Sequence, residues 1–159
     1  MKLLILILSF TIQNKAVVWE KEYKTSLTFE QLTSQLRQSG SFTDIQTSGT
    51  TLTARIENLE ADYKGAGYKE MTTPMFIARS FINAFVVIEY GAGSYTVSVK
   101  KIMLEQMYSD GLTRQGEKTS IETYALNRDK TDFKPAFKKS PATILDYTFQ
   151  NLFEPPQRD

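Results

Sequence analysis

Two carboxylates, Glu20 and Glu22, have the residue type and spacing that acid–base chemistry could use. Such a pair can hydrolyse a glycosidic bond when the two groups face each other across a cleft, about 5–9.5 Å apart. The segment 17–23 alternates apolar and charged side chains, which predicts a strand with both glutamates on one solvated face. The sequence therefore assigns no catalytic residue, and a carboxylate-based hydrolase acting on glycans is the alternative function.

The chain contains no cysteine and no histidine. This excludes disulfides, thiolate nucleophiles, Ser-His-Asp triads, Cys/His zinc sites and histidine acid–base catalysis. Asp129 and Asp132 could contribute to a calcium loop, but such a loop needs more oxygen ligands and a fixed glycine. We expect no metal site and no cofactor.

Aromatic side chains in polar loops are the best candidates for a binding surface. Tyr63 and Tyr68 lie in the polar segment 62–73, where they could contact a partner or could cover the edge of a sheet. The turn formed by Gly93, Ser94 and Tyr95 is the other binding candidate. A phosphate-binding loop is not expected at this turn, because a strand and not a helix follows the glycines.

The longest pattern in the chain, residues 81–104, predicts a central hairpin. The segment 81–90 is rich in β-branched and aromatic residues, and apolar and polar residues alternate from Tyr95 onward. After Lys100 and Lys101 the apolar set moves by one position, which indicates a β-bulge. The sequence leaves open whether residues 75–80 extend this strand or form a short helix.

Two amphipathic helices are predicted to cover the sheet. The first, 27–40, has a capping box formed by Thr28 and Gln31 and a glycine stop at Gly40. The second spans 140–153, with its apolar residues at helical spacing.

A second hairpin, with strands at 42–45 and 51–59, and a short helix over 119–126 complete the pattern. The order of elements predicts an α+β fold. We expect a curved antiparallel sheet of about five strands with two main helices packed on one face.

Residues 1–16, MKLLILILSFTIQNKA, run from a basic start through an apolar core to a polar end. This order is typical of a secretory signal, and the segment is too short to span a bilayer as a stable helix. The alternative is a buried first strand or helix. We expect a single domain over 17–154 and a short polar tail over 155–159, exported to the periplasm or secreted, without stable membrane insertion after signal removal.

The chain resembles a family of exported bacterial domains of unknown function with a TATA-box-binding-protein-like (TBP-like) fold. The resemblance covers about residues 17–153. It is carried by Leu52 to Ile56, by Thr73-Pro74, by VVIEYGAGSYTVSVKKIML and by ATILDYTFQNLF. It implies the fold and export but no activity.

These observations predict a non-catalytic binding or interaction module. Its 19 basic and 18 acidic residues nearly cancel, so a nucleic-acid partner is not expected. The partner is an unknown protein or small molecule. A structural subunit that pairs through a sheet edge is a further alternative.

Overall fold

The computed structural model describes residues 6–154, so residues 1–5 and the predicted tail at 155–159 lie outside the described part. It contains an eight-stranded sheet. The strands are β1 (Leu6–Ile7), β2 (Phe10–Gln13), β3 (Ala16–Lys24), β4 (Thr43–Ser48), β5 (Thr51–Glu60), β6 (Ser80–Gly91), β7 (Ser94–Gln106) and β8 (Lys118–Ser120). The helices are α1 (Phe29–Ser39), the 3-10 turn η1 (Glu70–Thr72), α2 (Met75–Ala78), α3 (Glu122–Ala125) and α4 (Ser140–Phe153).

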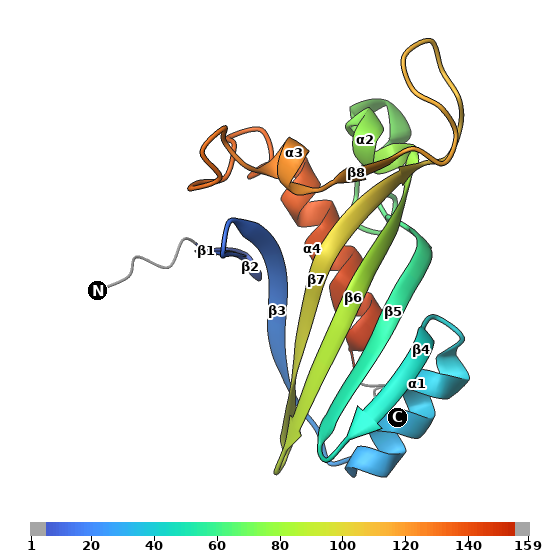
Figure 1. Ribbon diagram of the computed structural model, residues 1–159, viewed down its shortest axis with the longest axis vertical. Helices are drawn as coiled ribbons and strands as arrows, with labels where there is room; N and C mark the ends of the chain where they lie inside the picture. The colour runs from blue at the N-terminus through green and yellow to red at the C-terminus, as the bar shows by residue number, and fades with distance from the viewer. Residues whose placement is uncertain (1–5, 155–159) are drawn as a thin grey trace.

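The sheet is antiparallel, in the order β1-β2-β3-β7-β6-β5-β4, and β8 pairs with the far end of β7. Helices α1 and α4 both lie on one face, and the other face is left open (Figure 1). The predicted α+β class, the curved antiparallel sheet and the two covering helices are confirmed. The predicted number of about five strands is too low, because β1, β2 and β8 add to it.

Helices α1 and α4 bury the apolar faces that their sequences predict, and α1 has the predicted caps. Thr28 caps α1 through the expected box with Gln31, and Gly40 takes the left-handed conformation with φ 71°. In α4 the predicted apolar side chains, including Leu145 and Phe149, are buried. The sequence Ser140-Pro141 predicts a cap followed by a proline at the first helical position, but Ser140 is itself the first residue of α4 and Lys139 is the cap.

The strands that the sequence did not predict, β1, β2 and β8, are short or lie in segments to which the sequence assigned another role. Strand β2 falls within the segment predicted as a signal, and Phe10 lies opposite Trp19 on β3. Strand β8 pairs with the part of β7 that β3 leaves free. Thr119 therefore lies in a strand, and the helix predicted from 119 begins only at Glu122.

An aromatic cluster joins the sheet to α4. The Trp19 ring lies 5.5 Å from the Phe149 ring and 5.9 Å from the Phe153 ring. The indole Nε1–H of Trp19 donates a hydrogen bond of 3.0 Å to Asp146 Oδ1 in the interior. This contact joins the first long strand to the last helix.

Three bulges bend the sheet at neighbouring levels of adjacent strands. The register shifts between β4 and β5, between β5 and β6, and between β6 and β7. At each shift one residue has a positive φ: Asp44 with 51°, Asn58 with 56° and Lys101 with 51°. Each bulge increases the local twist and bend. The bulge predicted at Lys100–Lys101 is confirmed.

Candidate functional site

Tyr95, which the sequence places in the candidate binding turn, is a buried residue of β7 and is not exposed at that turn. It is only 2% exposed, stacks on Tyr23 at a ring distance of 5.3 Å, and donates a 2.8 Å hydrogen bond to the Phe153 carbonyl. The strand alternation that places Val97 and Val99 in the core places Tyr95 there as well.

This buried tyrosine pair makes stability sensitive to alkaline pH. Burial, with a contribution from Glu154, raises the pKa of Tyr95 to about 12. Burial also raises the pKa of Tyr23 well above its ordinary value, and the nearby charge of Tyr95 adds to this. An unfolded tyrosine ionises near pH ~10, so the unfolded state loses these protons first.

We therefore expect the free energy of unfolding to hold below pH ~10 and to fall as pH rises toward ~12. Denaturant unfolding at several pH values measures the slope. Tyr95→Phe is expected to be less stable at neutral pH, because the hydrogen bond to Phe153 is lost, but to show a shallower alkaline decline. An unchanged decline in that variant would contradict the assignment.

Gly93 and Ser94 form the tight end of the central hairpin. Gly93 is exposed and has φ 78°, and Ser94 pairs with Gly91 across the turn. The Gly93 carbonyl accepts a 3.0 Å hydrogen bond from the Thr25 backbone N–H. The turn is thus tied to the end of β3.

Tyr63 and Tyr68 are half-buried and pack against the core. The Tyr68 N–H donates a 2.8 Å hydrogen bond to the Tyr63 carbonyl, and Asp62 N–H donates to Thr148 Oγ1 on α4 at 3.0 Å. The loop is therefore anchored to the last helix. Tyr63 lines two hollows of about 390 and 330 Å³, but Tyr68 is not among their lining residues.

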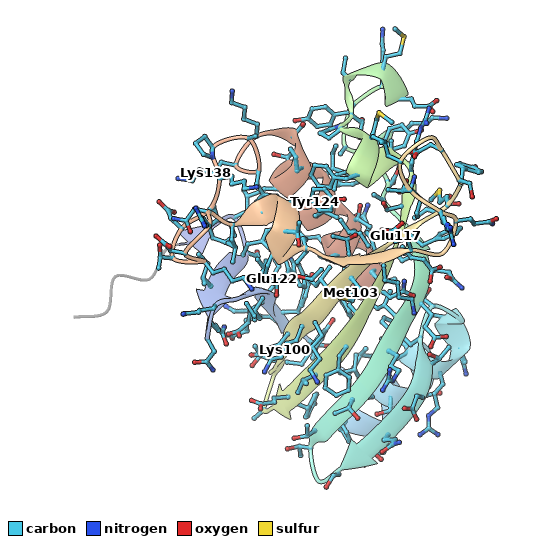
Figure 2. All side chains as sticks on the ribbon, turned by 45° about the horizontal axis from the view of Figure 1, so that its top comes forward. Lys100, Met103, Glu117, Glu122, Tyr124 and Lys138 are labelled. Carbon is cyan, nitrogen blue, oxygen red and sulfur yellow. The ribbon has the colours of Figure 1, made fainter. Side chains whose placement is uncertain are left out.

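The larger hollow lies at one end of the sheet, between the predicted candidate loop 62–73 and the loop after β7, which the sequence did not indicate as a site. It is lined by Glu60, Ala61, Tyr63, Glu70, Ala78, Arg79, Met107 and Tyr108. The Met107 N–H donates a 2.9 Å hydrogen bond to the Arg79 carbonyl, so the loop after β7 is fastened to the end of α2. Figures 1 and 2 both show the η1–α2 segment beside the long β7–β8 loop.

Large apolar side chains protrude at the same end of the molecule, which we call the loop end. Met71 and Leu112 are each 97% exposed, Tyr108 is 64% exposed and Met75 is 60% exposed. Among the described residues the one other exposed large hydrophobic is Leu8. An isolated apolar residue on a surface needs no explanation, but four exposed ones from η1, α2 and the β7–β8 loop make this end a candidate interaction site.

Asp110 orders the loop that carries Leu112. Its carboxylate accepts hydrogen bonds from the N–H groups of Leu112 at 2.8 Å and Thr113 at 2.7 Å, and from the Thr113 hydroxyl at 3.0 Å. These bonds, the one from the Leu112 N–H foremost, lower the pKa of Asp110 below its ordinary value. These hydrogen bonds fix the turn in which the Leu112 side chain is exposed to solvent.

Glu20 and Glu22 both lie on the open face of β3, as predicted, and both are exposed. Glu20 accepts a 3.3 Å hydrogen bond from the Ser98 hydroxyl on β7. Because the two carboxylates point the same way from one strand, they do not face each other as glycoside hydrolysis requires.

The edge strand β4 is interrupted by the Asp44 bulge, which disfavours continuous pairing with a neighbouring sheet.

Two solved structures share this arrangement. One is a TBP-like protein from Parabacteroides distasonis, with a TM-score of 0.55, 11% identity, and coverage of 89% of this chain and 90% of that chain. The other is a DUF4468 family protein from Bacteroides ovatus, with a TM-score of 0.53, 17% identity, and coverage of 97% and 95%. The chain has a TBP-like fold. No family model and no curated protein matches the sequence.

The TBP-like fold fixes the positions of the loops but does not identify a ligand, because proteins with the same fold can have unrelated functions. Within residues 6–154, no group of three or more acidic side chains is placed to hold a metal ion. No helix in the same range is long and apolar enough to cross a membrane. Among the described residues, the exposed apolar side chains make the loop end the candidate site.

Proposed function

We propose that the protein is a non-catalytic binding module that works outside the cytoplasm and docks a protein partner on the loop end. The observation that carries the proposal is the group of four large apolar side chains exposed at the loop end, one of which, Leu112, lies in a turn that Asp110 holds in place. An apolar side chain that an ordered turn exposes to solvent contributes no burial to the hydrophobic core. Its place in such an ordered turn is explained by contact with a partner.

The chemistry of the loop end favours a protein over other partners. Methionine and tyrosine are enriched at the centre of protein interfaces, where they adapt to a partner surface. The segments 60–79 and 107–118 carry five basic and five acidic residues, so they lack the positive surplus that nucleic acid or anionic lipid requires. A small molecule favours a concave apolar pocket, whereas the hollow at this end is lined in part by the charged residues Glu60, Glu70 and Arg79, and the exposed apolar side chains protrude.

The location outside the cytoplasm is supported by the order of residues 1–16, which matches a secretory signal. A cleavage near Val17 would also remove β2, which pairs with β3 along Phe10–Gln13. N-terminal sequencing of protein from its native host tests the cleavage, and a mature chain beginning with Met1 would refute it.

Photo-crosslinking tests the docking surface. A photoreactive residue replaces Leu112 in one protein and the exposed Gln38 on α1 in another, and both are irradiated in envelope extract of the native host. We expect a discrete protein adduct from position 112 and none from position 38. Adducts at both positions, or to lipid alone, would overturn the proposal.

The double variant Met71→Ser/Leu112→Ser provides a quantitative check once the partner is purified. Its binding is expected to weaken by about tenfold or more, since central apolar contacts dominate interface energies. Its unfolding free energy is expected to stay within about 0.5 kcal/mol of wild type, because both side chains face water.

A further inference from the structure

The open face of the sheet contains a hollow of about 340 Å³ at the level of the bulges. Strand β6 runs through its centre, with the Asn58 bulge on one side and the Lys101 bulge on the other. Asn83, Phe85 and Met103 all point away from the helices, and Figure 2 shows Met103 on β7 beside β8. The bend produced by the two bulges accounts for the hollow.

Cations dominate the rim of this hollow. Arg55, Lys101 and Lys118 line it against a single carboxylate, Glu57. Arg55 pairs with Asp44 at 3.6 Å, and Lys118 pairs with Glu105 at 3.7 Å. Both cations are more than half exposed, so these pairs are weak and can be exchanged for a ligand. Lys101 forms no ion pair with any residue of the described chain.

The side-chain amide of Asn83 provides the hollow with a hydrogen-bond donor that has no acceptor within residues 6–154. Its Oδ1 accepts a 3.2 Å hydrogen bond from the backbone N–H of Asn58, and this contact fixes the orientation of the amide. Its Nδ2 is buried and has no hydrogen-bond partner among the described residues. A buried donor left unsatisfied destabilises the folded state, because it has lost its hydrogen bonds to water without gaining a replacement. An incoming acceptor oxygen would remove that penalty.

Apolar groups complete the lining. Phe85 and Met103 lie on the same face as Asn83, and Met103 is its direct partner in the β6–β7 register. Methionine is flexible enough to move aside and uncover the Asn83 amide. The hollow therefore combines donors with a floor that suits a hydrocarbon or aromatic group.

We propose that this hollow binds a small organic oxyanion. A carboxylate or phosphate group is held by Arg55, Lys101 and the Asn83 amide, and its apolar body lies on Phe85 and Met103. The site lies on the open face, and it uses none of the exposed apolar side chains of the loop end. It is therefore independent of the proposed protein docking, and either can fail without the other.

NMR titration of the full chain tests the site, with the Asn83 side-chain amide signals as the readout. Phenyl phosphate and benzoate are the two anionic probes, and benzyl alcohol is the neutral probe of similar shape. We expect the Asn83 signals to move and saturate with at least one anion, and to respond at least about tenfold more weakly to benzyl alcohol. Saturation by one anion alone identifies which headgroup the site accepts.

A matched pair of lysine variants isolates the charge. Lys101 and Lys130 are both exposed and both have a positive φ, of 51° and 57°, but Lys130 is not among the residues that line the hollow. Asparagine tolerates this backbone conformation better than most residues. Lys101→Asn is expected to weaken anion binding by about tenfold, and Lys130→Asn to leave it unchanged. Equal effects of the two variants, or equal binding of benzyl alcohol, would overturn the proposal.

Discussion

Trp19→Ala is expected to lower the free energy of unfolding by about 3–5 kcal/mol. Trp19 is fully buried, and its ring packs on Phe149 and Phe153. Its removal leaves a large cavity between β3 and α4 and takes the hydrogen-bond donor away from Asp146, which is only 8% exposed. Denaturant unfolding followed by circular dichroism measures the change.

Two further variants separate the causes. Trp19→Phe keeps most of the ring packing but removes the indole N–H, so a smaller loss of about 1–3 kcal/mol is expected. Glu20→Ala, at the adjacent exposed position, is expected to change stability by less than about 0.5 kcal/mol. If Trp19→Ala proved no more harmful than Glu20→Ala, the aromatic cluster would not hold the sheet to α4.

Phe10→Ala is expected to cause a loss of similar size, about 3–5 kcal/mol. The Phe10 ring is fully buried, 5.7 Å from the Phe137 ring and 6.4 Å from the Phe149 ring. Gln13→Ala on the same strand is the control, because Gln13 is exposed and its loss is expected to be small. Equal stability of the two variants would show that β2 does not contribute to the core.

The Phe10 result bears directly on the predicted signal segment. A chain that starts at Val17 lacks the whole of β2, so it is expected to be less stable than Phe10→Ala. Comparison of residues 1–159 with residues 17–159 measures this loss. A shortened chain as stable as the full one would support the predicted domain boundary.

Sequence reasoning works best where local chemistry decides the structure. The capping box of Thr28 with Gln31, the stop at Gly40 and the bulge at Lys101 each depend on a few neighbouring residues, and all are present. It is weaker where partners are distant. Strand β8 has a short and mostly polar sequence, and its pairing with Leu104 of β7 is visible only in three dimensions.

The candidate sites were harder to predict than the fold. Tyr95 was assigned to a surface turn although its own strand alternation places it in the core. The sequence does not indicate Leu112 as a site residue, because one leucine in a polar loop carries no signal until the fold brings Met71, Met75 and Tyr108 to the same end of the molecule. The unpaired amide of Asn83 depends on the bulges on both neighbouring strands, and the sequence indicated one of them.

The contact between Trp19 and Asp146 spans 127 residues of chain. Strand β3 likewise joins the central strands of the sheet by pairing with β7, with Trp19 opposite Val99. Both contacts connect the amino-terminal part of the chain to residues that are made much later. Closing such long loops slows folding. The aromatic cluster around Trp19 can therefore be completed only after α4 has been synthesised, so it forms late in folding.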